Sequence, residues 1–146
     1  MSFDPEAAGW SRRPPVGFSA HTGPYWSRPE GSGWAYGLLV EPHHLNGHGI
    51  THGGLLMTML DNTMGLTAWH ATGQKPAVTM QMNTHFIAAA HPGEFLEARG
   101  EVVRLAKSVI FLRGQITVED RLVAVADGIW KVLGGRPGPK LEGDPA

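Results

Sequence analysis

The sequence predicts an α+β fold in which an antiparallel sheet wraps around one long central helix. A long apolar stretch over 54–71 ends at Gly73, and its length favours a helix buried on most sides. Four strand-like runs follow it, separated by turn residues. With 146 residues, 42% of them hydrophobic, the chain suits one domain with a real core.

The segment before this helix is expected to be mostly irregular. Residues 1–33 are rich in proline, glycine and tryptophan, which predicts an irregular N-terminal arm with a short helical turn near 16–21. Three tryptophans lie in or beside this arm, so we expect it to pack onto the rest of the molecule: Trp10, Trp26 and Trp34. A short strand over 34–41 and a loop over 42–51 follow.

The strands after the helix begin with an alternating run over 77–87. Thr79, Gln81 and Asn83 are expected on one face of it, and Met80 and Met82 on the other. Further strands are expected over 95–104, 108–119 and 121–133, the last two joined by a tight hairpin. The domain therefore spans 34–133, and the glycine- and proline-rich residues 134–146 are expected to form a flexible tail. The single helix is the only element that can cover the sheet.

Composition excludes several classes of function. The net charge is −1 and there is no basic stripe, so nucleic acid is not an expected partner. The absence of cysteine excludes disulfides, thiolate-zinc sites and a cysteine nucleophile. No apolar run approaches the ~20 residues of a membrane-spanning helix, and residues 1–6 lack the features of a signal peptide. We expect a cytoplasmic protein without a membrane partner.

The chemistry-bearing segment is a glycine-rich loop that leads into the helix, with Asp61 further along it. A helix N-terminus presents unpaired N–H groups that polarise a carbonyl oxygen or hold an oxyanion. Burial among apolar residues would raise the pKa of Asp61 and make it a better base near neutral pH. Alternatively, Asp61 faces water or accepts a hydrogen bond from Thr58, and the loop is only a turn. The residues alone leave both interpretations open.

The histidines at four-residue spacing, His44, His48 and His52, suggest a metal site at first sight. The glycines between them make a helix implausible there, and no HExxH-type carboxylate is present. A phosphate-binding loop and a serine nucleophile elbow are also absent. We therefore expect neither a metal nor a cofactor.

The segment from Asn46 to Asp61 resembles the signature of hotdog-fold acyl-CoA thioesterases of the PaaI-like, phenylacetate-pathway group. The pattern N-x-x-G-x-x-H-G-G, an apolar stretch and L-D reads here as Asn46, Gly49, His52, Gly53, Gly54, Leu60 and Asp61. Similar residues recur over 78–83, 92–93 and 96–98, so the resemblance spans roughly residues 34–133. It implies the hotdog fold and hydrolysis of acyl-CoA thioesters to free acid and CoA.

The resemblance also implies roles for individual residues. Asp61 would be a general base that activates water, or a nucleophile that gives a mixed anhydride. The Gly53 amide would polarise the thioester carbonyl, while Asn46 and His52 would position the thioester. Thr79 occupies the place of a Ser or Thr that orients the water, or it is an ordinary strand residue. Further substrate-binding residues are expected to be Gly54, Gln81, Met82, Asn83, Met57 and Met64.

Helix geometry adds an expectation about assembly. Gly53 and Asp61 are eight residues apart, which is about 12 Å along a helix axis. A base and an oxyanion donor must both lie about 3 Å from the reacting atoms. A second subunit must therefore supply one of them. We expect a homodimer with sites at its interface, and a homotetramer built as a dimer of dimers.

Two other functions fit the same fold. One is a non-catalytic sensor that binds acyl thioesters, although a sensor has no need of a buried acid such as Asp61. The other is a hotdog enoyl-thioester hydratase, which needs an acid and a histidine in one pocket, and only His70 and His85 are spare for that role. The acyl group, and whether its carrier is CoA or acyl carrier protein, remain open.

Overall fold

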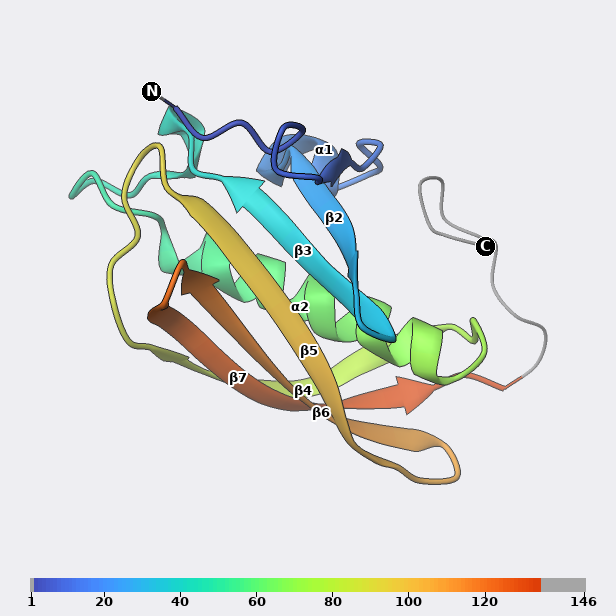
Figure 1. The fold of residues 1–146 in the computed structure, drawn as a ribbon. Coiled ribbons are helices and arrows are strands. Elements are labelled where there is room, and N and C mark those ends of the chain that lie inside the picture. Colours follow the sequence, from blue (N-terminus) through green and yellow to red (C-terminus); the bar gives the residue numbers. More distant parts are fainter. Residues whose placement is uncertain (1, 135–146) are drawn as a thin grey trace.

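A seven-stranded antiparallel sheet curves around one long helix in the computed structural model, which describes residues 2–134 (Figure 1). The order of the strands in the sheet is β1-β2-β3-β5-β6-β7-β4. The predicted fold class is therefore confirmed. In chain order the elements are β1 (Ser11–Arg12), α1 (Ser19–Thr22), β2 (Tyr25–Glu30), β3 (Gly33–Leu39), the 3-10 turn η1 (Pro42–His44), α2 (Gly53–Ala71), β4 (Ala77–Phe86), β5 (Phe95–Leu105), β6 (Val109–Val118) and β7 (Arg121–Val132).

The long helix α2 begins one residue earlier than the apolar stretch predicts. The reason is a side-chain cap, because His52 Nδ1 accepts a hydrogen bond from the Gly54 amide at 2.8 Å. The helix ends before Gly73, which adopts a φ of +69°. Burial on most sides was expected, but one face of α2 stays open: Met57 is exposed and Asp61 is only half-buried.

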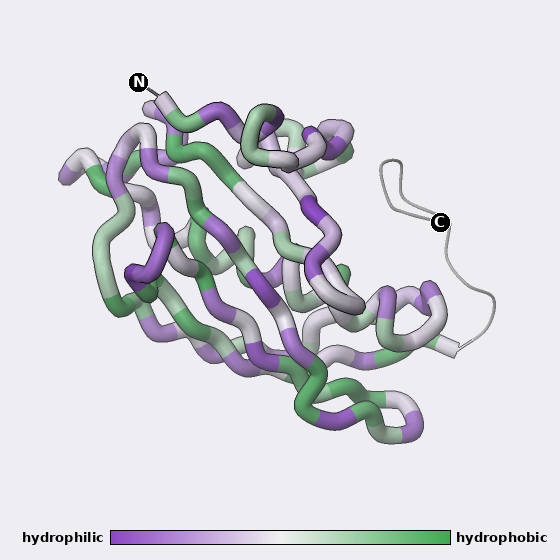
Figure 2. Tube along the Cα trace, viewed as in Figure 1, coloured by the Kyte–Doolittle hydropathy of each residue, from purple (hydrophilic) through white to green (hydrophobic). Residues whose placement is uncertain are grey.

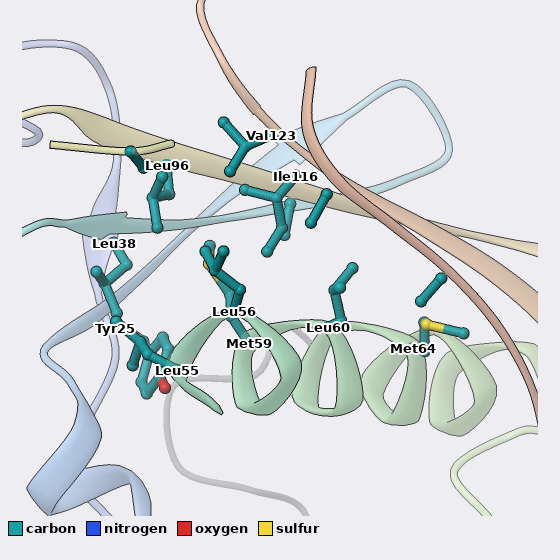
Figure 3. Close-up of a cluster of buried hydrophobic side chains, with 14 of the residues drawn as sticks. Tyr25, Leu38, Leu55, Leu56, Met59, Leu60, Met64, Leu96, Ile116 and Val123 are labelled. Atoms are coloured by element: carbon teal, nitrogen blue, oxygen red, sulfur yellow. The ribbon is translucent and has the colours of Figure 1, made fainter. Parts of the chain in front are cut away.

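The core lies between this helix and the concave side of the sheet. Figure 3 shows side chains of α2 directed at side chains of the sheet. Each buried aliphatic or methionine side chain contributes about 1.5–3 kcal/mol of hydrophobic stabilisation. Hydropathy alternates along the strands because only one of their faces meets the helix (Figure 2). The facing residues are Leu56, Leu60 and Met64 on α2, and Leu38, Leu96, Ile116 and Val123 on β3, β5, β6 and β7.

Strand β4 contains an irregularity that simple alternation misses. Its pairing with β7 shifts register between Thr79 and Gln81. Thr79 pairs with the buried Trp130, whereas Gln81 pairs with Ile129 and Asn83 pairs with Asp127. Cross-strand partners share a face, so Thr79 faces the helix while the other two face away from it. The prediction that Thr79, Gln81 and Asn83 share one face is wrong.

The N-terminal arm is more regular than its composition suggests. Strand β2 lies within the segment expected to be irregular and pairs along its whole length with β3. Pro29 is tolerated in β2 because β1 pairs only with Ser27 and Trp26, which leaves the missing N–H of Pro29 on an open edge.

The expected packing of the arm is confirmed for two of its tryptophans. Trp10 and Trp26 are buried in a second cluster with Ala35 and Phe95. The third, Trp34, is half-buried and stacks on His70 at a centroid distance of 6.2 Å. The expected flexible tail over 134–146 lies outside the described residues, apart from Gly134. Within residues 2–134 no helix is long and apolar enough to span a membrane.

Candidate active site

Asp61 and Thr79 meet across two elements. The Thr79 hydroxyl on β4 donates a hydrogen bond to Asp61 Oδ1 on α2, with 2.6 Å between the oxygens. The expected burial of Asp61 is not seen among residues 2–134, where it is only half-buried. Thr58 donates instead to the Gly54 carbonyl at 2.9 Å. The structure thus presents an oriented carboxylate on an open surface.

The start of α2 leaves one backbone amide unused. The Gly54 amide donates to the His52 side chain, and the amides of Leu55 and Leu56 donate to the His52 carbonyl. Within the part of the chain that the structure describes, the Gly53 amide has no hydrogen-bond partner. The positive end of the helix dipole therefore offers a free N–H donor at Gly53. His52 acts here as a helix cap.

Asn46 shapes the loop before the helix. Its side-chain oxygen accepts hydrogen bonds from the amides of His48 at 2.8 Å and Ile50 at 3.4 Å. The backbone N–H of Asn46 donates a hydrogen bond to the Ile50 carbonyl at 2.8 Å. The side-chain oxygen is thus engaged in the turn, and only the side-chain N–H₂ group remains to contact a substrate.

Several predicted substrate residues do not gather around Asp61. Met64 is fully buried in the core, and its expected role in substrate binding stays a prediction. Met82 is half-buried and packs against the core from β4. Met57 is exposed on the same open face of α2 as Asp61. Gln81 and Asn83 lie on the outer face of the sheet, so the structure does not bring them to Asp61.

A cavity lies between the N-terminal arm and α2. Its volume is about 610 Å³. Tyr25 and Tyr36 line it from β2 and β3, and Met59 and Leu66 line it from α2. Asn62, the neighbour of Asp61, also lies on its wall. Recognising the β2–β3 hairpin in the sequence would have indicated this wall. The proline and glycine content of residues 1–33 predicts irregular structure there instead.

His44 ties the loop before α2 to the arm. Its Nδ1 accepts a hydrogen bond from the Glu41 amide at 2.9 Å, so in the neutral ring Nε2 carries the proton and donates to the Thr22 carbonyl at 2.8 Å. Burial, together with the neighbouring His43, lowers the pKa of His44. Since His52 caps the helix and His48 is exposed, these histidines do not converge. No group of three potential metal ligands exists among residues 2–134.

Comparisons with known proteins identify the family of this chain. The family model of the thioesterase superfamily matches residues 48–125. A Pseudomonas aeruginosa protein named as an esterase is 32% identical over 94 residues, which cover 64% of this chain and 70% of that protein. Human acyl-coenzyme A thioesterase 13 is 28% identical over 62% of this chain, and the match spans 65% of its own length.

Solved structures show the same fold. A hypothetical thioesterase from Streptococcus pneumoniae, solved with coenzyme A, superposes with a TM-score of 0.69 at 27% identity, covering 77% of this chain and 90% of that one. The Escherichia coli PaaI protein superposes with a TM-score of 0.63 at 23% identity, covering 70% and 73% of the two chains. The chain belongs to the thioesterase superfamily and is a thioester hydrolase with the hotdog fold, in agreement with its resemblance to the PaaI-like group.

Proposed function

We propose that the protein hydrolyses acyl-CoA thioesters to free acid and CoA, with Asp61 as the catalytic acid–base or nucleophile. The observation that carries this proposal is the 2.6 Å hydrogen bond from Thr79 to Asp61 Oδ1 on the open face of α2. This bond orients the carboxylate and leaves Oδ2 available to accept a proton or attack a carbonyl carbon. The coenzyme A bound to the Streptococcus pneumoniae relative supports CoA as the carrier.

The Gly53 amide is the proposed donor to the thioester carbonyl. It is unpaired at the start of α2, where the helix dipole favours developing negative charge. Because Gly53 and Asp61 lie on one helix, their separation along its axis is about 12 Å. One chain's Gly53 and its own Asp61 therefore cannot serve the same thioester, and we propose that a second copy supplies the missing partner.

The surface around Asp61 supports such a dimer. Within residues 2–134, strand β4 is at the end of the sheet and pairs only with β7, so its other edge has no strand partner there. Phe86, whose cross-strand partner Ala124 is buried, is exposed on the helix-facing side of this strand next to Gly53, and Met57 is exposed on α2. A second copy on this face would cover these apolar side chains and bring its own helix start towards Asp61. Association of two such dimers remains a prediction.

The proposed reaction balances with these groups alone. In the general-base route, Asp61 Oδ2 takes a proton from water while the water oxygen attacks the thioester carbon. The Gly53 amide of the other copy holds the resulting oxyanion. The C–S bond then breaks, and the departing thiolate takes the proton from Asp61. In the nucleophilic route Asp61 attacks the thioester carbon, the C–S bond breaks and the thiolate departs. Water then hydrolyses the mixed anhydride, which restores the Asp61 carboxylate and supplies the proton that the thiolate takes up.

Release of free CoA from a panel of acyl-CoA thioesters tests the proposal. Asp61→Asn keeps the shape of the side chain but cannot take up a proton, so we expect kcat to fall by ~10²–10⁴-fold with the fold retained. The matched control is Asp127→Asn, which removes an exposed carboxylate from β7 and should leave kcat unchanged. Thioester binding without CoA release by the wild type would favour a sensor, and hydration of enoyl thioesters without CoA release would favour a hydratase.

A further inference from the structure

The cavity beneath the N-terminal arm takes part of its wall from residues that precede the match to the family model. Its arm-side wall, which includes Tyr25 and Tyr36, precedes residue 48, where the match to the family model begins. Its volume of about 610 Å³ falls within the roughly 300–1,000 Å³ of small-molecule sites. Tyr25, Tyr36 and Met59 are almost fully buried, so the walls are preformed and largely apolar.

The permanently charged side chains that line the cavity are both positive. Arg12 and Arg13 both contribute to the wall, and no aspartate or glutamate among the described residues does. Arg13 is held over the Tyr36 ring, with its guanidinium carbon 5.6 Å from the ring centroid. Arg12 lies on β1, whose backbone is paired with Trp26 of β2. An anionic group is therefore the ligand end that this part of the wall attracts.

A buried polar group on the α2 side also points to a ligand. Thr63 lines the cavity and is only 1% exposed, and its hydroxyl has no hydrogen-bond partner in the described part of the chain. Buried hydroxyls in folded proteins nearly always have a partner. A polar atom of a bound molecule would supply the one that is missing.

The cavity begins next to the candidate catalytic carboxylate. Asn62 lies on its wall and directly follows Asp61 on α2. Successive helix side chains are separated by about 100° around the axis and 1.5 Å along it. Asp61 and Asn62 thus lie on adjoining faces of α2, and the acyl path that we infer runs from the carboxylate over Asn62 into the space between Met59, Leu66 and the arm.

We propose that this cavity is the acyl subsite and that it selects acyl groups with an apolar body and a carboxylate at the far end. The inference rests on the proposed thioesterase function. The body of the acyl group packs against Tyr25, Tyr36 and Met59, and the terminal carboxylate pairs with Arg12 and Arg13. The arm thereby determines specificity while Asp61 and Gly53 perform the hydrolysis.

The test compares two CoA thioesters of equal chain length, octanoyl-CoA and its ω-carboxy counterpart suberoyl-CoA. Wild type is expected to have the higher kcat/KM for suberoyl-CoA. The double variant Arg12→Gln/Arg13→Gln should lose at least ~10-fold of that preference, as expected for a hydrogen bond between charged groups, with octanoyl-CoA hydrolysis unchanged. The control Lys75→Gln removes an exposed positive charge outside the cavity and should keep the preference.

Two outcomes overturn this assignment. Wild type with no preference for the ω-carboxy thioester would contradict it. An equal loss of kcat/KM on both thioesters in the double variant would also contradict it, because that result places the arginines on the phosphates of CoA.

A second variant tests the cavity itself: Leu66→Trp should fill it and slow octanoyl-CoA hydrolysis at least ~10-fold relative to acetyl-CoA. Equal effects on both chain lengths would place the acyl group elsewhere.

Failure of the thioesterase function can be told apart from failure of the acyl subsite. If wild type releases no CoA from any thioester, the proposed hydrolysis fails. The cavity is then tested by calorimetric titration with free suberate and free octanoate. Tighter binding of suberate by wild type, lost in Arg12→Gln/Arg13→Gln, supports the subsite on its own. Equal binding of the two acids, or no binding of either, overturns it.

Discussion

At the scale of single residues, the proposed chemistry depends on one hydrogen bond that the bulge in β4 makes possible. Without the register shift after Thr79, alternation along the strand would place its hydroxyl on the same face as Gln81 and Asn83, away from α2. With the shift, the hydroxyl lies 2.6 Å from Asp61 Oδ1. A local departure from regular strand geometry thus positions the residue that orients the candidate catalytic carboxylate.

Replacing Thr79 should affect turnover more than substrate affinity. Thr79→Val removes the hydroxyl but keeps the branched shape, so we expect kcat to fall by ~10–100-fold, as for loss of a hydrogen bond to a charged group. KM should change little, because Thr79 contacts Asp61 rather than the acyl chain. Steady-state kinetics on the best thioester would measure both constants.

The matched control for this prediction is Thr79→Ser. It keeps a hydroxyl at the same position, so most of kcat should be retained. If Thr79→Val remained as active as Thr79→Ser, the hydrogen bond to Asp61 would have no catalytic role, and Thr79 would be an ordinary strand residue.

At the scale of elements, the contact between the arm and the loop before α2 should respond to pH. Burial lowers the pKa of His44, whose ring donates to the Thr22 carbonyl and accepts from the Glu41 amide. The neutral ring is the form that makes both bonds, since a protonated Nδ1 cannot accept. In the unfolded chain the pKa of histidine is about 6.5.

The sign of the effect follows from this lowered pKa. As pH falls below ~6.5, the unfolded chain takes up a proton more readily than the folded chain does. The stabilisation is therefore present at neutral pH and is lost as pH falls from ~6.5 through the folded-state pKa of His44. Urea unfolding between pH 7.5 and 5 should show a larger drop in the free energy of unfolding for wild type than for His44→Gln. A drop of the same size in both would contradict the prediction, and exposed His21→Gln should behave like wild type.

The elements also show which parts of the structure sequence can predict. Helix α2 was predicted to within one residue because its apolar length and the glycine at its end are local signals. The β2 strand was missed because its stability comes from non-local contacts, with Trp26 packing on Trp10 and Phe95. The predicted face of Gln81 is wrong because the bulge arises from pairing with β7, which is distant in sequence. The motif from Asn46 to Asp61 can be recognised in the sequence. The lining of the cavity beside the arm depends on tertiary packing, so the sequence does not predict it.

At the scale of the whole molecule, the single chain leaves its candidate catalytic machinery incomplete. The half-buried Asp61, the open edge of β4 and the unpaired Gly53 amide all lie outside the core that the chain buries for itself. An isolated helix cannot bring residues 53 and 61 to the same reacting atom, because its rise separates them by about 12 Å. Two symmetric copies would create two identical sites, each composed of one acid and one amide from different chains.

Mixing two inactive variants tests this shared site. Gly53→Pro removes the amide proton at the first helical position, where proline is well tolerated. The preceding residue, His52, already has the extended ψ of 133° that proline requires of its neighbour. Gly53→Ala is the matched control, because it adds a Cβ in the same place, 3.3 Å from the Phe86 ring, and keeps the amide. We expect Gly53→Pro and Asp61→Asn homodimers to be folded and inactive, and Gly53→Ala to remain active.

In a heterodimer of Gly53→Pro with Asp61→Asn, one site would carry both substitutions and the other would carry neither. Heterodimers isolated with two different affinity tags should therefore regain about half of the wild-type kcat per dimer. Restoration to that level requires that Asp61 and Gly53 of one site come from different chains. If both homodimers are folded and inactive and the isolated heterodimer is inactive as well, the acid and the amide do not act across a subunit boundary.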